Sequence, residues 1–145
     1  MSYTLDSNIL IRSIEENHPQ QGEALDVINK LIGRGAEVFL LPQSLYEFWV
    51  VATRPRKDNG LELSASEAEA VLTKFESVFP LKHDAQATYQ VWRHLVTQHA
   101  VLGKNAHDAR IAAALKTHSI RRLVTFNKNH FKRFADITAL LPSEV

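Results

Sequence analysis

Short apolar runs alternate along this chain with longer segments in which apolar residues recur every three or four positions. The short runs predict β-strands at residues 3–5, 37–41, 123–126 and 137–140, with another short strand expected at 80–83. The longer segments predict helices over residues 20–32, 44–52, 66–79 and 84–100, and an alanine-rich helix that opens at Asp108. This alternation is typical of an α/β fold with a mainly parallel, twisted sheet covered by helices on both faces.

Polar residues at the expected helix starts indicate how the helices are capped. Ser44 and Glu47 have the spacing of a capping box, and Asp84 is the expected N-cap of the helix that follows it. Along that helix, Tyr89 and Trp92 fall in the apolar stripe. We expect both rings in the core, and a base-stacking role for Trp92 is the alternative.

The composition indicates one globular domain over residues 1–145. The chain has 145 residues, of which 45% are hydrophobic and 23% charged, and no repeat or linker divides it. It has no apolar run long enough to span a membrane and no signal-peptide pattern at its start. The absence of cysteine excludes disulfides, zinc–thiolate sites and cysteine nucleophiles, so a cytoplasmic setting is expected.

The net charge of +1 conceals an uneven distribution. Residues 1–103 carry 9 Lys/Arg and 13 Asp/Glu, whereas residues 104–145 carry 8 Lys/Arg and 3 Asp/Glu. A basic face formed by the C-terminal part would suit a polyanion such as a nucleic acid. Ordinary solvated helix faces explain the same asymmetry equally well, so both interpretations stay open.

Three acids share one structural context. Asp6 follows the first strand, Glu47 lies one turn into the helix after the second strand, and Asp108 opens the alanine-rich helix. In a parallel sheet these strand-to-helix junctions lie at one edge, so the carboxylates should repel one another unless a cation such as Mg²⁺ or Mn²⁺ is bound. Taken one at a time, each acid is also explained as a helix cap or first-turn residue.

Four segments together resemble the signatures of PIN-domain nucleases, and in particular the VapC-type toxin ribonucleases. In order, they are Leu5-Asp6-Ser7-Asn8-Ile9-Leu10, Pro42-Gln43-Ser44-Leu45-Tyr46-Glu47-Phe48, His107-Asp108-Ala109-Arg110-Ile111-Ala112-Ala113-Ala114 and Leu123-Val124-Thr125-Phe126-Asn127-Lys128-Asn129-His130-Phe131. The match spans essentially the whole chain. The resemblance implies a three-layer α/β/α PIN-like domain.

The resemblance also implies roles for individual residues. Asp6, Glu47 and Asp108 would hold Mg²⁺ or Mn²⁺, while Thr125 and Asn127 would orient a metal-bound water molecule or the third acid. His130, at a position where many family members carry another Asp, adds no carboxylate. The site would therefore hold a second metal ion less firmly than the first.

The implied activity is metal-assisted hydrolysis of an RNA phosphodiester, with one of the carboxylates taking a proton from the attacking water. Cations that could contact the RNA backbone lie near the signature segments. They are Arg54, Arg56, Lys57, Lys104, Arg110, Lys128, Lys132 and Arg133.

The resemblance further implies a protein partner. A toxin of this type is silenced by a cognate antitoxin, for which the apolar helices 44–52 and 66–79 would form a groove, and the nuclease would form homodimers. The alternative is that both helices are buried in the core. Two other functions stay open, an RNA-processing PIN nuclease without an antitoxin and an inactive PIN-like module that binds nucleic acid or protein.

Overall fold

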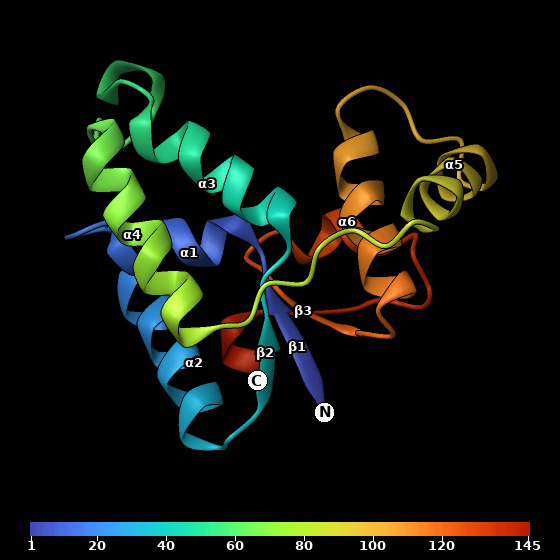
Figure 1. The fold of residues 1–145 in the computed structure, drawn as a ribbon, viewed down its shortest axis with the longest axis horizontal. Coiled ribbons are helices and arrows are strands. Elements are labelled where there is room, and N and C mark those ends of the chain that lie inside the picture. The colour runs from blue at the N-terminus through green and yellow to red at the C-terminus, as the bar shows by residue number, and fades with distance from the viewer.

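In the computed structural model, which describes all 145 residues, four parallel strands form the centre of the molecule (Figure 1). They are β1 (Ser2–Leu5), β2 (Glu37–Phe39), β3 (Arg122–Val124) and β4 (Thr138–Leu140), in the spatial order β2-β1-β3-β4. Tyr3 of β1 pairs with Val38 on one side and with Arg122 on the other. A parallel bridge between Leu40 and Leu81 lies where another short strand was expected. The predicted parallel sheet is confirmed.

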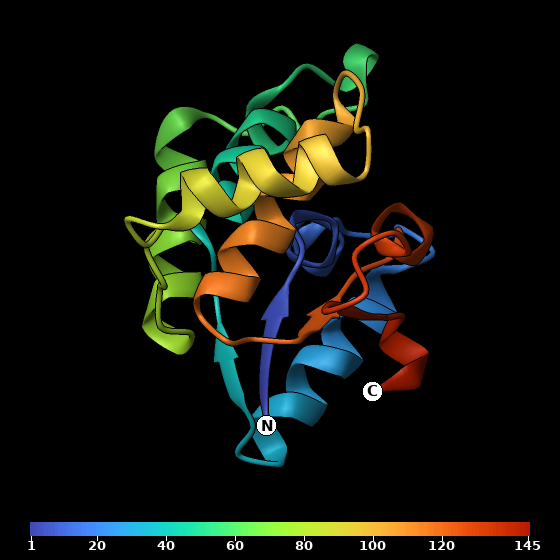
Figure 2. The ribbon, with the colours of Figure 1, turned by 90° about the vertical axis from the view of Figure 1, so that its right-hand side faces the viewer.

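Six helices cover the two faces of this sheet (Figures 1 and 2). One face carries α1 (Ser7–Ile14), α2 (Gln21–Gly33), α3 (Pro42–Thr53) and α4 (Ala65–Val78), and the other carries α5 (Thr88–Gln98) and α6 (Asn105–Thr117). Three short 3₁₀ helices are η1 (Arg56–Asp58), η2 (Lys128–Phe131) and η3 (Pro142–Glu144). The predicted three-layer α/β/α architecture is confirmed. None of the helices combines the length and apolar character that crossing a membrane requires.

Side chains along the strands alternate between two apolar cores, because successive residues of a strand point to opposite faces. Leu5 and Val124 enter the core that is shared with α1–α4, whereas Leu123 enters the core that is shared with α5 and α6. All three side chains are fully buried. Both cores hold the sheet in place, and the polar residues that follow β1 and β3 come together at one edge.

Helix α3 begins two residues earlier than the apolar pattern predicted, at Pro42. Proline suits this position because the first turn needs no N–H donor there. Leu41 is the N-cap, so Ser44 lies inside the first turn, where its buried hydroxyl has no hydrogen-bond partner. The predicted capping box of Ser44 and Glu47 is therefore wrong, and the Glu47 carboxylate is left for other partners.

Helix α5 begins later than predicted, at Thr88, and no side chain caps it. The predicted N-cap Asp84 instead accepts a hydrogen bond from Arg110 Nη2 at 2.7 Å. Tyr89, which was expected in the core, is 59% exposed, and Trp92 is only partly buried. The start of α5 is therefore an open surface rather than part of the core.

Candidate active site

Asp6 occupies the turn between β1 and α1. Its backbone N–H donates to the Val124 carbonyl at 3.0 Å, and its Oδ1 accepts from the Ser7 N–H at 2.8 Å, which caps α1. Only 6% of Asp6 is exposed. The residue is thus a helix cap and, at the same time, a buried carboxylate at the carboxyl edge of the sheet.

Thr125, directly after β3, fixes the other oxygen of Asp6. Its Oγ1 donates to Asp6 Oδ2 at 2.8 Å, and it accepts from Asn8 Nδ2 at 3.2 Å and from the Asn127 N–H at 3.0 Å. Asn8 Oδ1 in turn accepts from the Phe126 N–H at 3.2 Å. Because both lone pairs of the hydroxyl are occupied, its proton is directed at the carboxylate. Asn127 joins this network through its backbone N–H, and Asn127 as a whole is exposed.

Glu47, on α3, is held by two donors. Ser7 Oγ donates to its Oε2 at 2.9 Å, and Gln43 Nε2 donates to its Oε1 at 2.8 Å. The same Gln43 Nε2 lies 2.8 Å from the His107 carbonyl oxygen, which connects α3 to the first turn of α6. Gln43 is buried and its Oε1 has no hydrogen-bond partner. These contacts bring Glu47 toward the residue after His107, which is Asp108.

Asp108 lies in the first turn of α6, with 26% of its side chain exposed. The helix begins three residues earlier than expected, at Asn105. His130 Nδ1 lies 3.8 Å from Asp108 Oδ2, a separation longer than a hydrogen bond. Asp108 is therefore the acid of the three with the fewest direct contacts to the chain.

The three acids act on one another electrostatically. The pKa of Asp6 is raised to about 6, chiefly because the side chain is buried; the Thr125 hydrogen bond lowers it, and the charges of Glu47 and Asp108 raise it. Burial is also the main cause of the raised pKa of Asp108. The charge of nearby His130 lowers this pKa, and the charge of Glu47 raises it. Such a cluster is stabilised by a proton or by a cation.

The potential metal ligands at this edge of the sheet suit a hard divalent cation. They are carboxylate oxygens, which Mg²⁺ and Mn²⁺ prefer over nitrogen or sulfur. No three His, Asp or Glu side chains are close enough together to hold an ion by themselves. Mg²⁺ usually takes one or two carboxylates and completes its shell with water and substrate oxygens, so an open group of this kind fits it. The raised pKa of Asp6 marks the position where a cation can replace the proton.

Comparison with known families identifies the fold. A family model described as the PIN domain matches residues 3–137, nearly the whole chain. The chain belongs to the PIN domain family. The resemblance that was drawn from the four signature segments is thereby confirmed. No match was found among curated protein sequences.

Solved structures share this PIN fold at low sequence identity. VapBC2 from Rickettsia felis, bound to a DNA fragment from its promoter, is 18% identical with a TM-score of 0.71, covering 97% of this chain and 98% of the other. A toxin–antitoxin complex from Klebsiella pneumoniae is 19% identical (TM-score 0.65, 99% of each chain). VapC20 from Mycobacterium tuberculosis, a sarcin–ricin loop cleaving toxin, is 17% identical (TM-score 0.62, 88% and 92%).

The cations that were predicted to contact RNA differ in their surroundings in this PIN domain. Arg110 and Lys128 each pair with a carboxylate at 2.7 Å, whereas Lys104 is exposed at the N-cap of α6, near Asp108. Exposed Arg133 lies close enough to Asp108 to lower its pKa. Lys132 is exposed after η2. The remaining three come after the end of α3, which lies about 9 Å along the helix axis from Glu47; they are Arg54, Arg56 and Lys57.

Three residues that orient the acids had no predicted role, namely Ser7, Asn8 and Gln43. Ser7 and Asn8 are neighbours of Asp6, and both residue types are common at helix starts, so their side chains gave no signal beyond capping. Gln43 lies four positions before Glu47, a spacing that brings two side chains together on a helix. That spacing could have predicted the hydrogen bond from Gln43 to Glu47, because a buried amide needs a hydrogen-bond partner and a carboxylate can supply one.

Proposed function

We propose that this PIN domain is a Mg²⁺- or Mn²⁺-dependent endoribonuclease in which Asp6, Glu47 and Asp108, together with water and phosphate oxygens, would hold the metal ion. The observation that carries the proposal is the buried Asp6, with a pKa raised to about 6, beside two further carboxylates. A divalent cation relieves that repulsion and also binds phosphate oxygens. Membership of the PIN family supports a nuclease, and the similarity to VapC20, a sarcin–ricin loop cleaving toxin, supports RNA as the substrate.

The residues of the chain orient the acids and receive a proton. When bound, the metal ion would supply Lewis-acid stabilisation of the charge that develops on the phosphate. Thr125 holds Asp6 in one orientation, and Gln43 does the same for Glu47. Asp108, whose side chain is 26% exposed, accepts the proton of the attacking water. Attack breaks the bond from phosphorus to the leaving oxygen, which takes a proton from solvent.

We also infer that the nuclease is the toxin of a type II toxin–antitoxin pair, with an antitoxin segment bound between α3 and α4. A groove of about 280 Å³ runs between these helices, and its apolar walls favour a peptide partner. Its lining includes Pro42, Leu45, Tyr46, Trp49, Leu72 and Glu76. A toxin–antitoxin complex among the similar structures supports this partner.

A homodimer is part of the same proposal. On α3, Val50 is 57% exposed outside the groove, and Tyr46 at the groove is 62% exposed, so apolar surface stays open on this helix. Covering such side chains with a second copy of the chain removes them from water. Light scattering at high protein concentration should therefore give twice the mass of the chain, and a monomer would contradict the dimer.

Sequencing of RNA 5′ ends after incubation with the purified protein and Mn²⁺ tests the nuclease. The native chain should produce new 5′ ends at discrete positions, while Asp6→Asn and Asp108→Asn should produce none and stay folded. Cleavage by either variant at the native rate would refute the catalytic assignment. If the native chain binds RNA without cutting it, the protein is a binding module instead.

The antitoxin is tested by co-expressing the chain with the product of a short neighbouring reading frame that has a DNA-binding N-terminus. The two proteins should purify together and the nuclease should be silent until they are separated. A second sample with Trp49→Glu should lose the complex but keep cleavage, because the charge lies in the groove. An active nuclease with no such neighbour would indicate RNA processing instead.

A further inference from the structure

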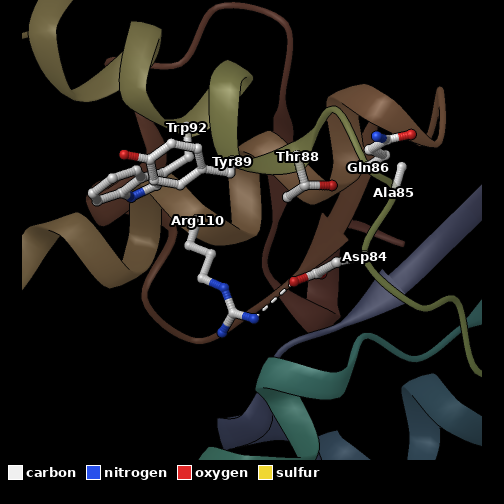
Figure 3. Close-up of a pocket in the computed structure, with 7 residues that line it drawn as sticks. All are labelled: Asp84, Ala85, Gln86, Thr88, Tyr89, Trp92 and Arg110. Carbon is white, nitrogen blue, oxygen red and sulfur yellow. Dashed lines mark hydrogen bonds and ion pairs between the residues drawn. The ribbon is translucent and has the colours of Figure 1, made fainter.

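A pocket of about 400 Å³ opens beside α6, outside the acid cluster (Figure 3). Its walls come from the loop before α5, from the first turns of α5 and from Arg110 of α6. This volume is within the range of sites that bind small ligands or single groups of larger ones. None of the roles assigned above to the acids or the groove uses these residues, although Trp92 also packs against the core.

One wall of the pocket is aromatic. The Tyr89 and Trp92 rings lie with their centroids 5.8 Å apart and their planes inclined by 32°. Trp92 is fixed in place because its Nε1–H donates to the Ala106 carbonyl at 2.8 Å. Tyr89 is 59% exposed, so its ring is supported on one side and open on the other. An exposed ring of this kind is a ready surface for stacking.

The opposite wall is polar. Arg110 Nη2 donates to Asp84 Oδ2 at 2.7 Å, and both side chains keep more than a third of their surface exposed (38% and 35%, respectively). The pair leaves further N–H donors on the guanidinium and free lone pairs on the carboxylate. A planar group that stacks on Tyr89 would meet both a donor and an acceptor at its edge.

The position of the pocket connects it to the acid cluster. Arg110 lies two residues after Asp108 on α6, so its Cα is about 3 Å further along the helix axis. Residues two positions apart do not face the same way, so the Arg110 side chain leaves the helix on a different face from Asp108. No Asp or Glu occurs between Thr88 and His107, the stretch that forms α5 and leads into α6. The one acid of the pocket, Asp84, is paired with Arg110. A polyanion bound at the acid cluster can therefore extend over this surface without meeting an unpaired negative charge.

We propose that this pocket binds one unpaired nucleobase of the RNA substrate. The base stacks on Tyr89, and its edge bonds to Asp84 and Arg110, which select among the bases. The inference rests on the proposed ribonuclease function and adds to it a site that sets sequence preference. The aromatic wall with a donor–acceptor pair at its edge favours a nucleobase over an apolar peptide side chain, which would leave that pair without partners.

Two measurements on the native chain and on Tyr89→Ala test the proposal. The first is the affinity for a labelled single-stranded RNA hexamer of mixed sequence, measured in chelator so that no cleavage occurs. The second is the base preference around the cut, read from 5′ ends of a random-sequence RNA with Mn²⁺. Tyr89→Ala should bind RNA roughly 5- to 100-fold more weakly and lose preference at one position. Asp84→Asn should change which base is preferred there.

Two control variants separate stacking from other effects. Tyr89→Phe keeps the ring and should match the native chain in both measurements. Ile32→Ala removes an exposed apolar side chain on α2, on the other side of the sheet, and should also match it. Since Tyr89 is exposed, all variants should keep the native melting temperature.

The outcomes distinguish this pocket from the proposed function. If the native chain cuts RNA and Tyr89→Ala matches it in affinity and preference, the base site is refuted and the nuclease stands. If no chain cuts RNA but Tyr89→Ala binds it more weakly, the nuclease is refuted and the base site stands. If the native chain neither binds nor cuts RNA, both are refuted. Loss of antitoxin binding with unchanged RNA binding would make the pocket a protein interface and overturn the proposal.

Discussion

The Thr125 hydroxyl makes all three hydrogen bonds that a hydroxyl can make, so its proton can point only at Asp6. It accepts from Asn8 and from the backbone of Asn127 and donates to Asp6. A buried carboxylate depends on such a donor because burial otherwise favours its protonated form. Thr125 therefore acts on the site through the ionisation of Asp6, and it needs no contact with substrate to affect the rate.

Thr125→Val keeps the shape of the side chain and removes the donor to Asp6. Because that hydrogen bond lowers the pKa of Asp6, its loss should raise the pKa above about 6. A hydrogen bond to a charged group contributes about 1.5–3 kcal/mol, so the acid limb of the pH–rate profile should move up by about one unit or more. Thr125→Ser keeps the donor and is the control. Equal profiles for the two variants would contradict this role.

Asp6→Asn should make the metal-free protein more stable at neutral pH. In the folded state Asp6 binds its proton more tightly than in the unfolded chain, so the free energy of unfolding falls as pH rises from about 4 to about 6. A pKa of about 6 against about 3.9 corresponds to at most about 3 kcal/mol, lost in full above pH 6. Asn is also a good N-cap, so the substitution should recover part of that energy.

Urea unfolding in chelator at pH 4 and at pH 7 measures this effect. The variant and the native chain should have similar free energies of unfolding at pH 4 and differ by one to a few kcal/mol at pH 7, in favour of the variant. A variant that is less stable at both pH values would show that Asp6 mainly stabilises the fold as a cap.

At the scale of elements, the site depends on how α3 and α6 are held together. Gln43 joins them, because its Nε2 lies 2.8 Å from both Glu47 Oε1 and the His107 carbonyl oxygen. Ser7 adds a link from α1 to Glu47 at 2.9 Å. Each acid thus comes from a different element, and polar side chains at the starts of these helices set their relative positions.

Gln43→Leu should loosen this link. The change keeps the volume and removes the donor shared by Glu47 and His107, so the free energy of unfolding should fall by about 1–3 kcal/mol. The cleavage rate should fall further than stability alone explains, because Glu47 would have one donor left. Gln98→Leu, at an exposed glutamine of α5, is the control for adding an apolar side chain. A native cleavage rate in Gln43→Leu would contradict the positioning role.

The sequence predicted the helices and strands, and also the edge of the sheet where strands lead into helices. Both follow from apolar periodicity and from the alternation of strands and helices, which can be read from residues close together in the chain. The prediction failed where a backbone preference or a distant partner decides. Helix α3 begins at Pro42, earlier than predicted, and Asp84 pairs with Arg110 instead of capping α5. The bonds from Ser7 to Glu47 and from Gln43 to His107 join residues 40 and 64 positions apart, and nothing local in the chain encodes such pairs.

At the scale of the whole molecule, the cations of the C-terminal part are not all free. Arg110, Lys116 and Lys128 each pair with a carboxylate. Exposed pairs of this kind contribute little to stability. Arg133 is exposed, makes no ion pair and lies near Asp108, so it is the cation best placed to meet RNA beside the acids.

RNA binding should therefore depend on salt, and Arg133 should carry part of that dependence. Arg133→Gln should reduce the slope of log affinity against log salt by about 0.7, the contribution of one phosphate contact on a single strand. Lys74→Gln, which removes an exposed lysine of α4, should leave the slope unchanged. Titration of labelled RNA at four salt concentrations measures both, and equal slopes for Arg133→Gln and the native chain would contradict the contact.

The hydrogen bond from Thr125 to Asp6 joins residues 119 positions apart, and it has a consequence for biosynthesis. A ribosome makes the chain from its N-terminus, so Asp6 is synthesised roughly 10 s before Thr125 at ordinary rates of translation. During that interval β1 has neither β3 beside it nor the donor that orients its acid. The acid cluster is therefore complete only after β3 has been synthesised, so the proposed nuclease activity should appear only late in synthesis.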